Sequence, residues 1–291
     1  MKPLGSIAIW CIILSLCIAP LEAVTRADSA FLALQCELIA KQRWTEKPFG
    51  ALVALVAQLF LGKPYRAGTL DSLQEETCYF TSDAFDCVTL TESALALARI
   101  ARSGRCNYGE FMRQLEFIRY RRGKLDGYLS RLHYTTDWIR DNSAKHVIED
   151  MTASMGGRSF KKRIDFMSTH PELYPQLRDS AALVPKIAAI ERRLSRQPLR
   201  ILPLAEINRV LANIQSGDII AIATSKPGLD YAHIGIALRS GGKIHLIHAS
   251  SKSGTVTLEQ NLEQYLRSYP NATGISVLRP LDPQVPHHRG K

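Results

Sequence analysis

The chain has 291 residues, 46% hydrophobic and 22% charged, and this ordinary globular composition excludes a chain that is disordered throughout. Its formal net charge of +10 favours anionic partners such as wall polymers, anionic lipid or nucleic acid, unless it is only a solvated surface. Six cysteines are too few for a disulfide scaffold.

The N-terminal segment has the pattern of a secretion signal. A lysine at the second position precedes an apolar run over residues 7–21, and Ala23 offers a small residue for cleavage. The run contains Pro20 and is shorter than the roughly 20 apolar residues of a spanning helix. We therefore predict a Sec signal peptide over residues 1–23, with cleavage after Ala27 as the alternative. A periplasmic or secreted location follows, and export argues against nucleic acid as the partner.

Helical patterns fill the next part of the chain. Apolar residues recur at helical spacing over residues 29–43 and 50–61, and the stretch CVTLTESALALARIA from Cys87 predicts a helix with an apolar stripe. Gly104 ends that helix. Residues 107–214 are predicted to be mostly helical and are strongly basic.

The last part of the chain changes to short β-rich runs separated by Gly, Pro and Ser. They lie at residues 217–224, 231–238, 243–250 and 274–278. This order predicts an α+β fold in which the cysteine-bearing helix packs on an antiparallel sheet. We expect one domain over residues 24–280, with 107–214 as a large insertion and a disordered tail over 281–291.

Cys87 is the first candidate for chemistry. It lies at the start of a predicted helix, where the helix dipole and free N–H groups favour the thiolate. Asp86 can cap that helix, and N–H groups of the first turn could hold an oxyanion. A buried structural thiol is the alternative at such a position, so a partner base is needed. The pairing of Cys36, Cys78 and Cys106 stays open.

The segment YAHIGIALRSGGKIHLIHASS predicts a β-hairpin that turns at Gly241-Gly242. With this two-residue turn, His233 and His248 are diagonal neighbours on one face, and His245 points to the other face. An odd-length loop would exchange His245 for His248. The pattern therefore predicts Cys87 as nucleophile, His233 as base, and His248 as the group that orients it.

The two faces of this hairpin differ in size. Gly235 and Ala237 lie on the histidine face, and their small side chains leave room for the cysteine helix to pack closely. The opposite face suits a hydrophobic core, since it carries Ile234, Ile236, Leu238 and Ile247.

FDCVTL at residues 85–90, AHIGIAL and LIHAS resemble the NlpC-type, papain-like cell-wall cysteine hydrolases, in which Cys, His and a third polar residue occur in this order. More specifically, the chain is similar to the N-acetylmuramoyl-L-alanine amidase-like family, through GKPYRAGTLD, FDCVTLTE, YLSRLHYTTDWIRDN and the histidine hairpin. The resemblance implies a papain-like fold. It also implies hydrolysis of an amide in peptidoglycan fragments, at the bond between N-acetylmuramic acid and L-alanine.

Further residues are candidates for substrate binding. Tyr65 matches a family tyrosine upstream of the nucleophile, beside the oxyanion site, and Asp86 adjoins the nucleophile. The insertion contains hydrogen-bond donors, a fixed cation and aromatic area, which suit a sugar-peptide that carries carboxylates. These residues are Ser130, Arg131, His133, Tyr134, Asp137 and Trp138. A structural Arg–Asp pair within an amphipathic insertion is the alternative.

Other functions remain open at this stage. A zinc amidase could use His233, His245 and His248, although the last two point to opposite faces and no HExxH helix is present. A stem-peptide endopeptidase of the same fold and a non-catalytic wall-binding protein are the others. We predict no cofactor or metal, and a monomer without stable membrane insertion that acts on muropeptides.

Overall fold

The computed structural model describes residues 19–71 and 75–283. Most of the expected signal peptide and the tail from residue 284 lie outside the described residues. The last expected signal residues, 19–23, form the start of helix α1 (Ala19–Lys41). Within the described residues, no helix is long and apolar enough to span a membrane.

The centre of the fold is an antiparallel sheet with the strand order β2-β3-β8-β4-β5-β6-β7, and β1 pairs with β8. The strands are β1 (Ile148–Asp150), β2 (Arg158–Phe160), β3 (Leu199–Pro203), β4 (Ile219–Thr224), β5 (Tyr231–Ser240), β6 (Lys243–Ser250), β7 (Thr255–Glu259) and β8 (Ala272–Pro280). The four expected strands correspond to β4, β5, β6 and β8. The other strands have three to five residues, too few to show a clear alternation.

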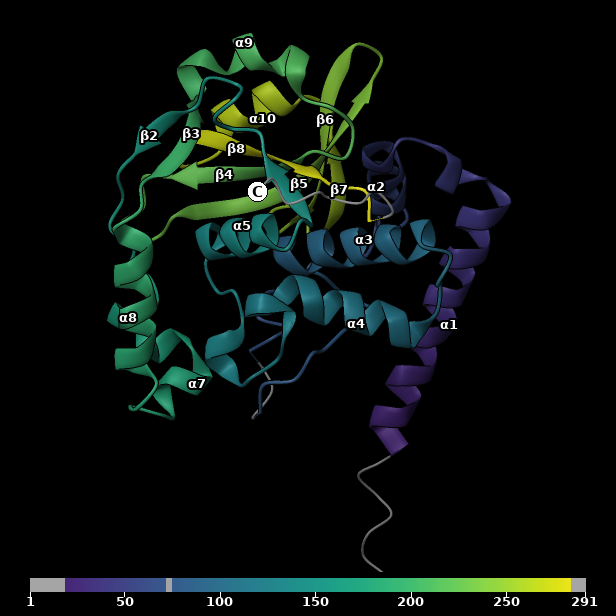
Figure 1. The fold of residues 1–291 in the computed structure, drawn as a ribbon, viewed down its shortest axis with the longest axis horizontal. Helices are drawn as coiled ribbons and strands as arrows, with labels where there is room; N and C mark the ends of the chain where they lie inside the picture. Colours follow the sequence, from purple (N-terminus) through teal and green to yellow (C-terminus); the bar gives the residue numbers. More distant parts are fainter. Residues whose placement is uncertain (1–18, 72–74, 284–291) are drawn as a thin grey trace, which may run out of the picture.

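Helices cover both faces of the sheet. In Figure 1, α3 and α5 lie below the sheet, and α9 and α10 lie above it. Besides α1, the helices are α2 (Phe49–Gln58), α3 (Cys87–Arg102), α4 (Tyr108–Arg119), α5 (Thr135–Ala144), α6 (Phe166–Thr169), α7 (Pro175–Arg178), α8 (Val184–Ser195), α9 (Ile207–Val210) and α10 (Leu262–Ser268). Single 3₁₀ turns lie at Trp44–Glu46, Arg121–Gly123, Tyr128–Ser130, Pro171–Leu173, Leu204–Glu206 and Leu211–Asn213. The mixed α+β class is as expected, although the insertion also supplies β1, β2 and β3.

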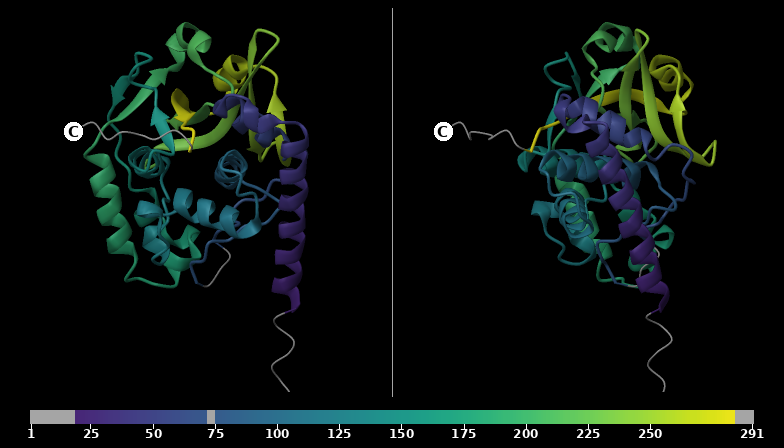
Figure 2. Two further views of the ribbon diagram at one scale, coloured as in Figure 1. Left: turned by 45° about the vertical axis from the view of Figure 1, so that its right-hand side comes forward. Right: turned by 90° about the vertical axis from the view of Figure 1, so that its right-hand side faces the viewer.

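Helix α3 is the central helix of the core. Every side chain from Thr89 to Ala101 is buried, so the helix is enclosed on all sides rather than along one stripe. The reason is that α2, α4 and the strands β5 and β6 all contact it. Figure 2 shows α1 running along the side of the body and extending beyond it at the N-terminal end.

The two faces of the β5–β6 hairpin pack differently from expectation. Helix α3 shares its hydrophobic cluster with Ile234 and Ile236, whereas Ala237 on the histidine face packs with Leu262 and Leu266 of α10. The expectation that small residues make room for the cysteine helix is therefore wrong. A buried, apolar α3 needs the isoleucine face, and Gly235 is small because a Cβ there would lie 3.0 Å from the His248 Cβ.

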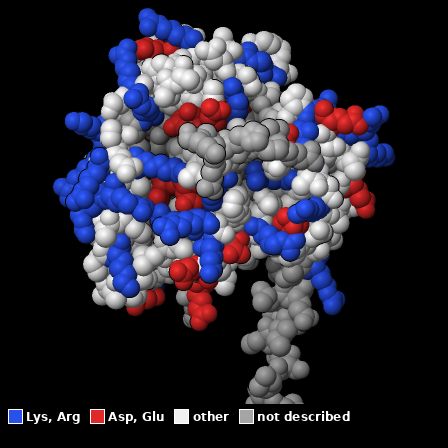
Figure 3. All heavy atoms as spheres, in the orientation of Figure 1, with Lys and Arg blue, Asp and Glu red and all other residues white. Residues whose placement is uncertain are grey.

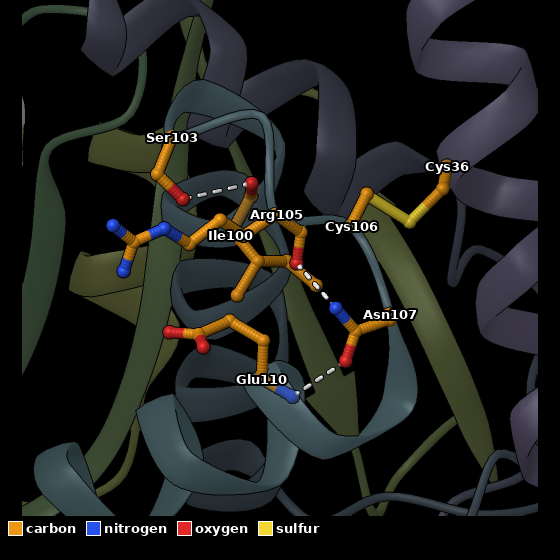
Figure 4. The surroundings of a disulfide bond; sticks show 7 residues. All are labelled: Cys36, Ile100, Ser103, Arg105, Cys106, Asn107 and Glu110. Atoms are coloured by element: carbon orange, nitrogen blue, oxygen red, sulfur yellow. Dashed lines mark hydrogen bonds between the residues drawn. A yellow bond between two sulfur atoms is a disulfide. The ribbon is translucent and has the colours of Figure 1, made fainter.

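A disulfide joins Cys36 of α1 to Cys106, which lies between α3 and α4 (Figure 4). The two Cα atoms are 5.9 Å apart, and the bond links positions 70 residues apart in the chain. Asn107 follows directly and caps α4 by accepting from the Glu110 N–H at 2.9 Å. Cys78 and Cys87 carry free thiols.

The excess positive charge is unevenly distributed over the surface. Figure 3 shows Lys and Arg side chains gathered on the left of this view, around α8 and the strand that follows it. Exposed side chains in this region include Arg192, Arg193, Arg196 and Arg200. This basic side belongs to the insertion.

Candidate active site

Helix α3 begins at Cys87 because Asp86 caps it. The Asp86 Oδ1 accepts from the backbone N–H of Val88 at 3.0 Å and of Thr89 at 2.7 Å, and the Thr89 hydroxyl accepts from the Asp86 N–H at 2.9 Å. This reciprocal capping box secures the start of the helix. It also occupies two of the N–H groups expected to serve an oxyanion, and leaves that of Cys87 itself.

The hairpin brings two histidines together. Its turn is the expected pair Gly241-Gly242, both with positive φ, and Ser240 pairs with Lys243. The His233 Nε2 lies 2.7 Å from the His248 Nδ1, with the two rings nearly perpendicular. The His245 Nε2 instead lies 3.3 Å from the Ser240 carbonyl. The third group beside His233 is therefore His248.

Glu259 at the end of β7 completes this chain of hydrogen bonds. Its Oε1 lies 3.3 Å from the His248 Nε2. Because a carboxylate only accepts, the His248 Nε2–H donates to Glu259, and the His248 Nδ1 accepts from the His233 Nε2–H. The His233 Nδ1 then keeps its lone pair. This is the tautomer that a general base requires.

A β-bulge lies immediately before His233. Along β4 and β5, Ile222 pairs with His233 and Ala223 pairs with Tyr231, so Ala232 is the extra residue. Bulges change the direction of side chains and are frequent beside active sites. His233 and Cys87 consequently line one cavity at the end of the sheet, although α3 packs on the opposite face of β5.

The pKa shifts of Cys87 and His233 both favour the neutral form. Burial, with the nearby Asp86 charge, raises the pKa of Cys87 to about 12, although hydrogen bonds from backbone N–H groups, including that of Ile234, oppose this. Burial and the adjacent His248 lower the pKa of His233 to about 3. Burial thus outweighs the helix-terminus effect expected from the position of Cys87, and the resting pair is a thiol and a neutral imidazole.

The cavity has a volume of about 260 Å³, and three of the expected insertion residues line it. Arg131 pairs with Asp71 and lies near Glu76. The other two are His133, whose Nε2–H donates to the Tyr128 carbonyl at 2.8 Å, and Tyr134, whose hydroxyl donates to Glu191 at 2.6 Å. Burial and the Arg131 charge keep the pKa of His133 well below its usual value. Each of the three therefore has an internal partner as well as contact with the cavity.

The remaining insertion candidates do not line this cavity. The Ser130 hydroxyl donates to the Gly127 carbonyl at 2.7 Å, and the Trp138 Nε1–H donates to Glu92 at 3.2 Å. Asp137 accepts two hydrogen bonds from Arg121, at 2.9 and 2.6 Å. The structural Arg–Asp pair considered as the alternative is thus present, with Arg121 as its cation.

Tyr65 lies close to Cys87. Its backbone pairs with that of Phe85, and its N–H donates to the Gly254 carbonyl at 2.8 Å. Burial raises the pKa of Tyr65, and the charges of Cys87 and Asp86 act in the same direction, so its hydroxyl is within electrostatic reach of both groups.

Three residues beside the histidines were not predicted from the sequence: Glu259, Tyr265 and Tyr269. The Tyr269 ring stacks on His233 with centroids 5.6 Å apart, and the Tyr265 ring lies 4.9 Å from that of His248. A usable signal exists for the tyrosines, because LEQYLRSY after Asn261 is a short helix pattern with leucines four residues apart. In the part of the chain that the structure describes, no three His, Cys, Asp or Glu side chains converge as a metal site.

The family model for N-acetylmuramoyl-L-alanine amidase-like proteins, named AmiA-like, matches residues 55–275. The chain belongs to this family. It is 38% identical to an N-acetylmuramoyl-L-alanine amidase from Bacteroides uniformis ATCC 8492, with a TM-score of 0.75 over 80% of this chain and 99% of that one.

Two other solved structures are similar. A putative xylanase from Bacteroides fragilis is 40% identical, with a TM-score of 0.72 over 77% of this chain and 99% of that one. A protein from Legionella pneumophila str. Philadelphia 1 is 19% identical with a TM-score of 0.66, which shows the shared fold alone. No curated protein matches the chain.

Proposed function

We propose that this family member is an exported cysteine amidase of the NlpC-type, papain-like class, which cleaves the amide between N-acetylmuramic acid and L-alanine in peptidoglycan fragments. The observation that carries the proposal is that Cys87 and His233 line one cavity and that His233 is hydrogen-bonded to His248, in a chain of the amidase-like family. A thiol at a helix start beside an oriented imidazole is the arrangement for acyl transfer.

The mechanism begins from the neutral pair. As the Cys87 Sγ attacks the lactyl carbonyl carbon, its proton moves to the His233 Nδ1, and the carbonyl oxygen becomes an oxyanion. The Cys87 N–H and the Tyr65 hydroxyl are the donors we assign to that oxyanion. Collapse breaks the C–N bond, and His233 gives the proton to the departing L-alanine nitrogen.

The second half of the reaction releases the sugar. Water attacks the thioester carbonyl while His233 takes one of its protons, and the Cys87 sulfur leaves with that proton. A carboxylic acid forms on the lactyl group, and the free thiol is restored. In both halves His248 and Glu259 act as positioning residues, because they hold the tautomer of His233 and stabilise its imidazolium.

The carboxylates of the cavity speak against glycoside hydrolysis, the activity in the name of one similar protein. Glycosidases typically use two carboxyl groups that flank the scissile bond. Here Asp86 caps α3, Asp71 pairs with Arg131, and Glu92 binds Arg119 at 2.7 Å. Asp230 accepts from two backbone N–H groups. These four carboxylates already have internal partners.

For substrate contacts we retain the insertion residues that line the cavity, Arg131, His133 and Tyr134. Asp86 contributes through the helix cap. For export, the supporting observation is the Cys36–Cys106 disulfide, because such bonds persist in the periplasm and outside the cell.

The test is mass spectrometry of purified muropeptides incubated with the chain lacking residues 1–23, beside the same chain carrying Cys87→Ala. We expect free stem peptide and intact sugar from the unmodified chain alone. Cleavage inside the peptide would make the protein an endopeptidase with the same nucleophile. If products were equal for both chains, Cys87 would not be the nucleophile and the cysteine mechanism would be wrong. If products were absent from both, wall binding without catalysis would replace the proposal.

A further inference from the structure

A second and larger cavity, of about 700 Å³, meets the first at His233. Ala232 and His233 line both cavities, whereas Cys87 lines only the smaller one. The larger cavity lies between α10 and the loops that follow β4, β6 and β7. Its polar side chains include Lys226, Lys252, Asn261, Gln264, Tyr265 and Tyr269.

The proposed reaction places the two halves of the substrate on different sides of His233. After the first step the acyl half is bonded to the Cys87 sulfur, so it stays in the cavity that contains this sulfur. The departing nitrogen takes its proton from His233, so the leaving half lies next to the imidazole. The cavity with His233 but without Cys87 is therefore on the side of the leaving group.

We propose that this larger cavity, here called the leaving-group cavity, binds the acidic peptide that departs as an amine. The inference rests on the proposed function and deepens it, since it assigns one half of the substrate to a site. The ligand of this cavity is a short peptide with a free amino terminus and carboxylates along its length.

The charged residues that line the two cavities favour a peptide with carboxylates as the ligand of the larger one. Lys226 and Lys252 come from different loops and are both exposed, and the one acidic residue in the lining, Glu259, is hydrogen-bonded to His248. The smaller cavity is lined by four acidic residues, Asp71, Asp86, Glu92 and Asp230, against two arginines. An acidic peptide is therefore attracted to the larger cavity and repelled by the smaller one.

The remaining groups of the leaving-group cavity suit a peptide backbone. The Asn261 Oδ1 accepts from the Gln264 N–H at 3.1 Å, which leaves the amide NH₂ of Asn261 as a donor. Tyr265 and Tyr269 place aromatic area next to both histidines. Amide donors, aromatic walls and separated ammonium groups together form a site for an extended, anionic ligand.

The experiment measures binding of the peptide product. An acidic tripeptide that begins with L-alanine is titrated by calorimetry into the full chain carrying Cys87→Ala, with or without Lys226→Gln and Lys252→Gln. Two exposed charge contacts predict roughly tenfold weaker binding for the double lysine variant. Lys186→Gln with Lys243→Gln is the matched control, since both lysines are exposed and line neither cavity. We expect that control to bind as tightly as its parent.

Kinetics separate this inference from the proposed function. In the chain with Cys87 intact, the double lysine variant should raise KM for an acidic muropeptide and leave KM unchanged for the same substrate with its carboxylates amidated. Cys87-dependent hydrolysis with unchanged binding and KM would overturn the leaving-group cavity and leave the amidase standing. Lysine-dependent peptide binding without any Cys87-dependent hydrolysis would leave a peptide site and overturn the amidase.

Discussion

Two sets of hydrogen-bonded polar residues lie within this molecule, one where α3 meets the hairpin and one inside the insertion. In the first set, hydrogen bonds run from Glu259 through His248 to His233 and end on a nitrogen with a free lone pair beside a cavity. In the second set, pairs such as Asp137–Arg121 close on themselves. A hydrogen-bond chain that ends on an unused lone pair at a cavity is thus a better indicator of a candidate site than polar residues along a helix.

The largest expected effect comes from removing the proposed nucleophile. Cys87→Ala should lower kcat by at least about 10³-fold, because the covalent intermediate cannot form. Muropeptide turnover measures the loss, and a matching circular dichroism melt shows that the fold is retained. Cys78→Ala is the control, since its thiol lies 3.9 Å from the Met112 carbonyl, does not line the cavity and has a pKa raised to about 12 by burial. An equal loss of kcat in both variants would contradict the assignment.

The corresponding stability test uses a closed pair that joins α3 to the insertion. Glu92 and Arg119 form a salt bridge with both side chains 2% exposed, and Glu92 also accepts from Trp138. Glu92→Ala leaves a buried cation without its partner and should cost about 3–5 kcal/mol of unfolding free energy in urea. Glu263→Ala, which removes the exposed pair with Arg267, should cost no more than about 0.5 kcal/mol. Similar values for the two variants would contradict the distinction.

A smaller effect tests whether Glu259 acts through His248. Glu259→Ala should lower kcat/KM about tenfold, which corresponds to about 1.4 kcal/mol of activation free energy, because the tautomer of His233 is no longer fixed. In a His248→Asn background the same change should have no effect, because the asparagine carbonyl accepts from His233 without help. A merely structural role for Glu259 would instead give the same loss in both backgrounds. Kinetics of the unmodified chain, the two single variants and the double variant, measured across pH, decide between the two roles.

The smallest effect is a pH dependence of stability. The folded chain keeps His233 neutral down to about pH 3, whereas an unfolded histidine with a pKa near 6.5 takes up a proton. The unfolded state then binds more protons, so the contribution is complete above pH 6.5 and is lost as pH falls towards 3. Between pH 6.5 and 5.5 the loss is about 1 kcal/mol. Urea unfolding should show a weaker slope for His233→Asn, and an unchanged slope for that variant would refute the assignment.

Local features of the site could be predicted from the sequence because each depends on neighbouring residues. The capping aspartate directly precedes Cys87, and the turn with positive φ consists of the neighbouring residues Gly241 and Gly242. The turn length sets the strand register, and the register brings His248 rather than His245 to His233.

Features that depend on long-range packing could not be predicted in this way. Both faces of β5 are covered by helices, so the side-chain pattern alone does not say which face α3 takes. The bulge at Ala232 is visible only in the pairing with β4. Arg131 and Asp137 are six residues apart and suggest a shared role, yet each has a different partner in space.

The disulfide and the free thiol of Cys87 lie at opposite ends of α3. The helix has 16 residues, which separates Cys87 from the turn that holds Cys106 by roughly 24 Å at about 1.5 Å per residue. A disulfide needs Cα atoms within about 7 Å of each other. Because α3 is a helical spacer buried from Thr89 to Ala101, the thiol of Cys87 cannot exchange with the cross-link of its own chain. An oxidising compartment can therefore lock the scaffold without exchange between the Cys36–Cys106 bond and the Cys87 thiol.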